Sequence, residues 1–285
     1  MSDALSHRRA LQRHPILAAA AFALLVGMAG CGDREPTTGP EIPPLQLTWQ
    51  DEFDGPAGQA PDSTKWAYDV GTNWGNSQLE YDTKRTENAS LDGQGNLTIV
   101  ARREDYSGCA YTSARINTRG RFTQTRGRFE ARMRLPSGQG LWPAFWLLGA
   151  NINTVGWPTC GEIDIMEYKG QQPTIVHGSL HGPGYSGGSS LTGAFQLPYG
   201  AFDTGFHVFA VEWKSDRIVW KVDGLTYKTA TAADLPPGTN WVFDHPFYVI
   251  LNVAVGGNYV GGPSPSTPFP QTMTVDYVRV YADAP

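Results

Sequence analysis

The sequence is poor in charge, in cysteine and in long apolar runs. Only 17% of its 285 residues are charged, and 22 Lys and Arg against 27 Asp and Glu give a net charge of -5. A mildly acidic chain without a basic cluster after residue 30 argues against nucleic acid and anionic membrane surfaces as partners. No glycine-rich turn of the phosphate-binding kind opens a helix, so nothing indicates a nucleotide, flavin or haem cofactor.

The longest apolar run, residues 16–30, follows a basic stretch at residues 7–14 and is too short to span a bilayer comfortably. This layout predicts a signal peptide over residues 1–30 and export of the protein. The run ends at Met28-Ala29-Gly30-Cys31, which resembles the lipobox of bacterial lipoproteins, where the cysteine becomes the lipidated first residue. Two localisations stay open: a cell-envelope lipoprotein that meets the membrane only through Cys31, or an extracellular protein released by an ordinary signal peptide.

The segment that follows, residues 31–44, is rich in Pro, Thr and Gly and has no apolar period, which predicts a flexible tether. The folded domain is therefore expected over residues 45–285, and we expect a monomer. Export would leave Cys109 and Cys160 in an oxidising compartment, where they either pair as a disulfide or stay as free thiols.

Turn-forming and aromatic residues are abundant, with 33 Gly, 21 Pro and 12% aromatics. Convincing amphipathic helices are absent, so the composition favours a single all-β domain. Apolar Phe129, Ala131 and Met133 alternate with charged neighbours, which is typical of a half-buried strand. We expect strands over residues 97–102, 113–118, 128–135, 142–148, 161–168, 175–181, 207–213, 218–222, 247–255 and 272–281. So many short strands predict a β-sandwich of jelly-roll type, with two packed antiparallel sheets.

The segment Gly161-Glu162-Ile163-Asp164-Ile165-Met166-Glu167-Tyr168 interleaves three carboxylates with apolar residues. Glu162 and Asp164 share one face of a strand by the two-residue period, whereas Glu167 has the wrong parity. One extra residue at Ile165–Met166, a β-bulge, would bury both apolar side chains and turn Glu167 to the acidic face. Bulges re-aim side chains in this way and occur often beside active sites.

Three like charges on one strand face repel each other, so a purely structural role would gain nothing from them. An ordinary solvated strand face is the alternative interpretation. Crowding raises at least one carboxyl pKa, and an acid catalyst working near neutral pH needs a raised pKa. Glycoside hydrolysis requires one deprotonated and one protonated carboxyl group. We therefore predict that this strand carries catalytic residues.

The same segment, GEIDIMEY, resembles the active-site strand of family 16 glycoside hydrolases, in the bulged form of laminarinases and of some agarases and carrageenases. The resemblance covers nearly all of the domain, from WQDEF at residues 49–53 through TSARINT at 112–118, residues 127–149 and 206–213, to FPQTMTVDYVRVY at 269–281. Among family members, GQGLWPAFWLLG together with TSARI is most similar to the 1,3-β-glucanases. The resemblance implies a substrate cleft on the concave face of the sandwich and endo-acting hydrolysis of 1,3-β-glucan without a catalytic cofactor.

Carried over residue by residue, the resemblance implies that Glu162 is the nucleophile of a retaining mechanism and Glu167 is the acid/base. Asp164 would hydrogen-bond the nucleophile. Retention requires carboxyl groups about 5 Å apart, whereas the backbones of Glu162 and Glu167 would be roughly 13–16 Å apart on an extended strand. Their side chains must therefore lean toward each other.

Sugars present flat C–H faces edged by hydroxyl groups, so polysaccharide sites combine aromatic platforms with hydrogen-bonding side chains. The resemblance implies that Trp142, Trp146 and Trp157 line the cleft, although each could instead be a core residue. Trp213 and Trp220 lie inside alternating strands, and we expect both in the core.

Three polar residues also match family positions that contact substrate or lie near the acid/base. They are Arg115 within TSARINT, Asn76 within WGNSQLEY, and His181 within Ser-Leu-His. Laminarinases often read W-G-N-N-E-L-Q-Y at the second of these segments, and this chain departs from that pattern at three positions. A surface charge is the alternative for Arg115, and a structural role is the alternative for His181.

Many relatives bind a structural calcium ion on the convex face, and the matching positions are Glu52, Gly95 and Asp276. Carboxylate and main-chain oxygens are the hard ligands that calcium prefers. No contiguous calcium-binding loop is present in the sequence. The calcium site is therefore an expectation of the resemblance alone.

Two kinds of rival function stay open. An agarase, carrageenase, mixed-linkage glucanase or transglycosylase would use the same two carboxylates with a different groove. A non-catalytic β-glucan-binding module is the remote alternative, because such modules lack the catalytic glutamates that this chain keeps.

Overall fold

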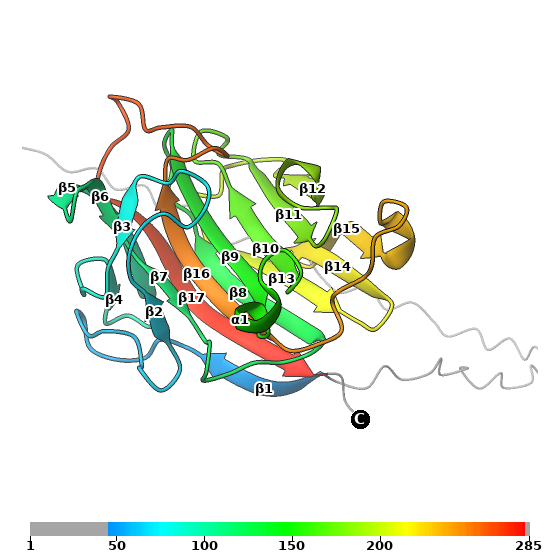
Figure 1. Ribbon diagram of the computed structural model, residues 1–285. Helices are drawn as coiled ribbons and strands as arrows, with labels where there is room; N and C mark the ends of the chain where they lie inside the picture. The colour runs from blue at the N-terminus through cyan, green and yellow to red at the C-terminus, as the bar shows by residue number, and fades with distance from the viewer. Residues whose placement is uncertain (1–44, 283–285) are drawn as a thin grey trace, which may run out of the picture. The chain divides into compact units, whose positions relative to one another are not determined.

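Two sheets packed face to face make up residues 45–282, the part of the chain that the computed structural model describes. Figure 1 shows the two layers, with β9, β10 and β16 in one and β13, β14 and β17 in the other. Within residues 45–282 all strand pairs are antiparallel except one, the parallel pair of β3 with β6 at an edge. The prediction of an all-β sandwich with two antiparallel sheets is confirmed.

The larger sheet has ten strands. In spatial order eight of them are β15 (Leu225–Thr231), β14 (Arg217–Val222), β13 (His207–Trp213), β8 (Gly127–Arg134), β17 (Gln271–Ala282), β5 (Leu97–Tyr106), β6 (Cys109–Ser113) and β3 (Glu80–Asp82). Two further strands pair off this path, β1 (Gln46–Asp51) with β17 and β4 (Ala89–Leu91) with β5.

The smaller sheet has seven strands. Their order is β12 (Leu191–Gln196), β11 (Ile175–His181), β10 (Glu162–Tyr168), β9 (Leu141–Gly149), β16 (Phe247–Val255), β7 (Arg115–Asn117) and β2 (Ala67–Asp69). Helical segments in the described residues are short: α1 (Ile152–Val155) and two 3-10 turns, η1 (Gly187–Ser189) and η2 (Ala232–Asp234). None of the helices in residues 45–282 is long and apolar enough to cross a membrane.

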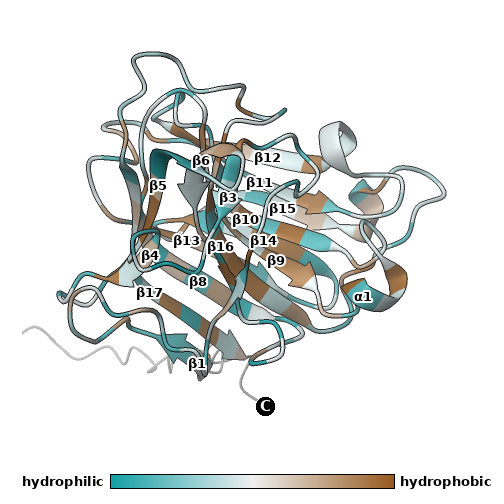
Figure 2. Ribbon diagram, turned by 60° about the vertical axis from the view of Figure 1, so that its left-hand side comes forward, coloured by the Kyte–Doolittle hydropathy of each residue, from teal (hydrophilic) through white to brown (hydrophobic). Residues whose placement is uncertain are grey.

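The hydrophobic core lies between the two sheets, because alternate side chains of each strand point inward. Figure 2 shows hydrophobic and hydrophilic residues alternating along strands of both sheets. On β8, Phe129, Ala131 and Met133 are fully buried, as their alternation with charged residues predicts. Trp213 and Trp220 are also fully buried, which confirms that both are core residues.

The strands that the sequence analysis did not predict are β1, β2, β3, β4, β12 and β15, together with all of β6 except Ser113. Apart from β6, which lies between β5 and β3, each is at the edge of a sheet or pairs off the main path. One face of such a strand contacts solvent, and one of its edges has no neighbouring strand. Its alternation of apolar and polar residues is therefore weak. On β12, for example, half-buried and exposed positions alternate and none is fully buried.

The strand predicted over residues 113–118 is wrong as a single element. Residue Ser113 ends β6 in the larger sheet, and Arg115 begins β7 in the smaller sheet. Buried Ala114 lies between them, where the chain crosses from one layer to the other. Both halves carry buried residues, so the sequence pattern runs through the crossing without a break.

The two described cysteines are free thiols. Cys109 is half-buried on β6 and Cys160 is buried just before β10. Burial raises the pKa of the Cys160 thiol to about 11. The predicted signal peptide at 1–30, the tether at 31–44 and the lipidation site Cys31 lie outside the described residues.

Candidate active site

The acidic strand β10 contains the predicted bulge. Asp164 pairs with Ser179 on β11 and Glu167 pairs with His177, so two residues of β10 lie opposite the single residue between them. The register of β10 against β9 shifts at the same place. Ile165 and Met166 are buried in the core, and the extra residue turns Glu167 to the face that carries Glu162 and Asp164.

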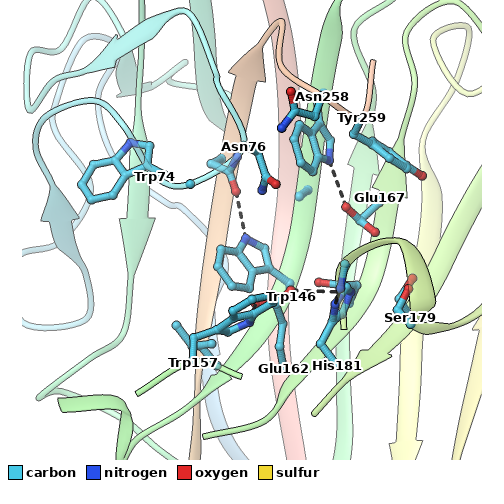
Figure 3. A pocket seen from close by; sticks show the side chains of 18 of the residues that line it. Trp74, Asn76, Trp146, Trp157, Glu162, Glu167, Ser179, His181, Asn258 and Tyr259 are labelled. Carbon is cyan, nitrogen blue, oxygen red and sulfur yellow. Dashed lines mark hydrogen bonds and ion pairs between the residues drawn. The ribbon is translucent and has the colours of Figure 1, made fainter. Parts of the chain in front are cut away.

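Each of the two outer carboxylates accepts a hydrogen bond from an indole N–H. Trp157 Nε1 donates to Glu162 Oε2 at 3.0 Å, and Trp142 Nε1 donates to Glu167 Oε1 at 3.1 Å. Figure 3 shows Glu162 and Glu167 entering the same cleft from different points along the strand. An indole N–H stabilises the ionised form of a carboxyl group without adding a charge.

The middle carboxylate, Asp164, lies against His181 from β11. His181 Nε2 is 2.9 Å from Asp164 Oδ2 and 3.7 Å from Glu162 Oε1. On the far side of the ring, the backbone N–H of Gly187 donates to His181 Nδ1 at 3.0 Å. Nδ1 is therefore the acceptor, and Nε2 carries the proton that faces the two carboxylates.

Within the described residues, Glu162, Asp164 and His181 form the one group of metal-binding side chains whose ligand atoms lie within 4.8 Å of one another. A metal ion would need the lone pair of His181 Nε2. The Gly187 N–H already occupies the lone pair of Nδ1, so Nε2 presents a proton to the site. The cluster therefore does not fit a metal ion.

All three carboxyl groups have raised pKa values. Burial is the main cause and raises the pKa of Glu162, Asp164 and Glu167 each to about 8. The charge of Asp164 raises the pKa of both glutamates further, whereas His181 and the indole donors lower it. The site therefore retains protons near neutral pH, which a general acid requires.

The carboxylates lie in a cleft of about 700 Å³ over the seven-stranded sheet. The cleft runs from Trp74, in the segment after edge strand β2, to Thr192 on edge strand β12. The structure places every residue that the sequence analysis assigned to the groove along this cleft: Asn76, Arg115, Trp142, Trp146, Trp157 and His181. Trp157 is 49% exposed, so its ring face is open to a sugar.

Several cleft residues were not predicted from the sequence. They come from loops or from strands whose polar residues look like ordinary surface positions: Trp74, Gln78, His177, Ser179, Thr192, Asn252, Asn258 and Tyr259. Trp74 carried one usable signal, because it stands within the segment that also holds Asn76. The Tyr259 ring packs against Trp142 at a tilt of 42°, with ring centroids 4.9 Å apart, a contact that sequence spacing does not reveal.

Arg115 is not a free surface charge. Its guanidinium group pairs with Asp69 at 3.0 Å and lies over the rings of Trp74 and Trp146, at 4.9 and 4.8 Å from their centroids. Arg115 therefore makes cation–π contacts with Trp74 at the edge of the cleft and with Trp146 on its floor, and so joins the two.

Behind this edge, Glu80 and Asp82 are buried together on β3. Asp82 Oδ2 accepts the indole N–H of Trp74 at 2.9 Å, and Glu80 Oε2 accepts the backbone N–H of Val255 at 2.7 Å. Burial raises the pKa of Glu80 to about 7, and burial together with the charge of Glu80 raises that of Asp82 well above its ordinary value. This carboxyl pair supports the loop that carries Trp74.

The three positions expected to hold calcium lie away from the cleft. Their oxygens are chemically suitable, and Gly95 lies beside the segment after Glu52, where an added Cβ would be 3.9 Å from Asp54 Oδ1. Both carboxylates are engaged by arginine, however. Arg279 donates to both oxygens of Glu52 at 2.8 Å, and Arg132 donates to Asp276 at 2.5 Å. Calcium would therefore have to displace these guanidinium groups.

A family model for the glycosyl hydrolases of family 16 matches residues 69–279. A β-glucanase of Rhodothermus marinus is 45% identical over 271 residues, which cover 90% of this chain and 92% of that protein. A glucan endo-1,3-β-glucosidase of Cryptopygus antarcticus is 38% identical and covers 82% of this chain and 90% of its own length.

Solved structures agree with the sequence relatives. The catalytic domain of an endo-1,3-β-glucanase (laminarinase) from Thermotoga petrophila superposes with a TM-score of 0.81 at 46% identity, over 86% of this chain and 100% of that one. The residues that the family model matches, 69–279, include the bulged strand and the residues that line the cleft. The resemblance inferred from the sequence is confirmed, and the chain is a glycoside hydrolase that belongs to family 16.

Proposed function

We propose that the protein is a retaining endo-1,3-β-glucanase. The observation that carries the proposal is the bulge in β10, which brings Glu162 and Glu167 onto one face at the floor of an open, tryptophan-lined cleft. The relatives reported above are named as a β-glucanase, a glucan endo-1,3-β-glucosidase and an endo-1,3-β-glucanase, and each match covers more than 80% of this chain. The cleft crosses the sheet from edge to edge, which suits binding of a polysaccharide on both sides of the cleaved bond.

In the first step, Glu162 acts as the ionised nucleophile and Glu167 as the protonated acid. A Glu162 oxygen forms a bond to the anomeric carbon while the bond from that carbon to the glycosidic oxygen breaks. The proton of Glu167 moves to the departing oxygen, which leaves as a hydroxyl group of the released chain. The Trp157 N–H, bonded to Glu162 Oε2, stabilises the carboxylate before attack.

In the second step, water attacks the anomeric carbon of the glycosyl ester from the opposite face. Glu167, now ionised, takes a proton from the water while the bond to Glu162 breaks. Both carboxyl groups return to their starting states, and two inversions give net retention. The raised pKa of Glu167 suits both roles, because the group must be an acid in one step and a base in the next.

Asp164 and His181 prepare the nucleophile. The Nε2–H of His181 faces Asp164 and Glu162 together, so it can shift toward Glu162 when Asp164 is protonated. Asp164 is almost fully buried, and its ionisation beside Glu162 would repel the second charge. The pair thus adjusts the charge that Glu162 experiences without contacting the sugar.

Product analysis tests the substrate. We expect laminarin to be cut internally, giving a ladder of oligosaccharides early in the reaction. Lichenan, agarose and carrageenan, assayed side by side, distinguish the rival enzymes on the same scaffold. Glucose released alone from the start, or faster cleavage of agarose, would refute the assignment.

Chemical rescue tests the roles. We expect Glu162→Ala to lose turnover by several orders of magnitude, because both steps depend on the glycosyl ester. Azide in the vacated space should then attack directly and give the α-glycosyl azide. Glu167→Ala should still react with an aryl glycoside whose leaving group needs no proton, and azide should give the β-product. The opposite anomers in an NMR spectrum would mean that the two roles are reversed.

Three further parts of the proposal rest on sequence alone. We propose that the protein is exported, attached to the cell envelope through Cys31 and monomeric. Fractionating cells that express Cys31→Ser beside the wild type tests the anchor, and a wild-type protein that is already fully soluble would refute it.

We also propose that the Glu52, Gly95 and Asp276 oxygens hold a structural calcium ion once their arginine partners are displaced. If so, chelation should lower the melting temperature of the wild type and leave Glu52→Gln unchanged. An equal melting temperature with and without chelator in the wild type would refute the site.

A further inference from the structure

A core tryptophan reaches the catalytic strand from the opposite sheet. Trp220 lies on β14 and is fully buried, and its Nε1–H donates to the carbonyl oxygen of Asp164 at 2.7 Å. Asp164 is the last residue of β10 in regular register before the bulge. A bulge disrupts the sheet ladder locally, and the indole supplies a donor at the point where the disruption begins.

The strand beside the bulge is shaped to admit this indole. Gly178 on β11 is the single residue opposite Ile165 and Met166. A Cβ at Gly178 would lie 2.3 Å from Trp220 Cδ1 and 2.6 Å from Trp220 Nε1. Any other residue would therefore push the indole away from the carbonyl that it bonds.

The sheet that carries Trp220 is irregular at the same level. The register between β14 and β15 shifts at Trp220, where Tyr227 of β15 is the extra residue. A Cβ at Gly178 would also lie 2.5 Å from Tyr227 Oη. The bulge in β10 and the bulge in β15 thus face each other across the core. Gly178 leaves the space between them that the Trp220 and Tyr227 side chains occupy.

We propose that Trp220 is a positioning residue for the reaction: its indole N–H fixes the β10 bulge and thereby aims Glu167 at the glycosidic oxygen. Glu162 precedes the bulge and is held in register by Leu148 and His181. Glu167 follows the bulge, so its position depends on the bulge geometry. Loss of the indole bond should therefore impair the acid more than the nucleophile. The inference rests on the proposed function, because it assigns Trp220 to the acid step.

The test compares Trp220→Phe with Trp213→Phe. Trp213 is equally buried, and its Nε1–H donates to the Phe243 carbonyl at 3.2 Å, so its acceptor is not a residue of β10. Each variant is assayed on laminarin, whose leaving group needs a proton, and on an aryl β-laminaribioside with an activated leaving group. The value of kcat/KM reports the first step in both cases.

We expect Trp220→Phe to lower kcat/KM on laminarin by about 10- to 100-fold, the scale of a misplacement near 1 Å. On the activated aryl glycoside the loss should stay below about threefold, because that first step needs no acid. Trp213→Phe should change neither value per folded molecule. Equal losses of Trp220→Phe on both substrates, or no loss beyond that of Trp213→Phe, would overturn the inference.

If Trp220→Phe does not fold, β-(3-benzothienyl)alanine at position 220 keeps the ring shape and replaces the N–H by sulfur. The same substrate ratio then decides, with the same replacement at position 213 as the control. A wild-type protein that cleaves neither substrate overturns the proposed function and this inference with it. A wild type that cleaves both, with an unchanged ratio in the variants, overturns the inference alone.

Discussion

The two indole donors should control opposite limbs of the pH–activity profile. Trp157 donates to Glu162 and Trp142 donates to Glu167, and a hydrogen bond to the ionised form lowers a carboxyl pKa. Replacing either tryptophan by Phe keeps an aromatic face for the sugar and removes the donor, so the pKa of the bonded carboxyl group rises. Activity requires Glu162 ionised and Glu167 protonated.

The signs follow from these requirements. Activity rises with pH as the nucleophile ionises, so a higher pKa of Glu162 in Trp157→Phe moves the acid limb to higher pH. Activity falls with pH as the acid ionises, so a higher pKa of Glu167 in Trp142→Phe moves the alkaline limb to higher pH. The second variant should therefore be active at alkaline pH values where the wild type has declined.

The size of each shift follows from the donor and its exposure. A hydrogen bond to a charged group contributes about 1.5–3 kcal/mol, and one pKa unit corresponds to about 1.4 kcal/mol. The full effect would be about one to two units. Trp157 is 49% exposed, so water replaces part of its contribution, and we expect about half a unit there. Trp142 is less exposed, and we expect about one unit.

The assay is kcat/KM on laminarin across a mixed buffer of constant ionic strength, because its limbs report the free enzyme. Trp146→Phe is the matched control: its indole donates to the Asn252 amide oxygen at 2.9 Å, not to a carboxylate. That variant should lose affinity and keep both limbs. A limb shift in Trp146→Phe as large as in the other two, or a shift of the alkaline limb in Trp157→Phe, would refute the reasoning.

Three further predictions concern the supports of the cleft. Burial raises the pKa of Glu80 from 4.5 to about 7, so the stability that this group contributes is present below the lower value and lost as pH rises through the higher one. The free energy of unfolding of the wild type, measured by denaturant titration, should therefore decrease relative to that of Glu80→Gln as the pH rises from 4.5 to about 7. A difference between the two proteins that does not change with pH would contradict this. Arg115→Lys should raise KM by about tenfold with little change in kcat, because Lys lacks the planar group that stacks on Trp74; unchanged KM would count against a binding role. In a Cys31→Ser background, a thiol reagent should modify Cys109 quickly and buried Cys160 only after unfolding, and two fast thiols would disprove the burial of Cys160.

The sequence predicts the fold class well because the central strands carry strong alternation. On β8, buried Phe129, Ala131 and Met133 alternate with charged residues, and this two-residue period shows which face of the strand points into the core. Edge strands such as β12 are not predicted, because neither face of the strand is fully buried and the apolar alternation is weak. The passage of the chain from one sheet to the other at Ala114 is not predicted either. A change of sheet gives the chain a new partner strand but leaves its apolar pattern unchanged.

The same limit applies to the site. Parity alone indicates the bulge, because Glu162 and Asp164 share a face that Glu167 can reach only through an extra residue. Contacts between distant segments have no such local signal. Trp220 is 56 positions from Asp164, whose carbonyl it bonds, and along the chain it reads as one more core aromatic. Asn252 and Tyr259 likewise reach the cleft from strand β16 and the loop after it.

A direct cation partner distinguishes several structural carboxylates from the working ones, although buried Glu80 and Asp82 accept only N–H donors of Val255 and Trp74. In the described part of the chain, Asp51 pairs with Lys65, Asp69 with Arg115 and Glu52 with Arg279. Each of these cations places a fixed positive charge directly beside the carboxylate.

The side-chain donors and ion-pair partners of Glu162, Asp164 and Glu167 within residues 45–282 are two indoles and one imidazole. An arginine at Glu167 would depress the pKa of the acid and remove the proton that the glycosidic oxygen must receive. A neutral polysaccharide brings no charge to compensate a fixed cation. The electrostatics of this cleft therefore depend mainly on burial, with indole and imidazole N–H groups as the direct partners of the carboxylates. Lys169 and Lys228 lower the pKa of Glu167 and Asp164, respectively, through their charge, without a hydrogen bond or ion pair to either group.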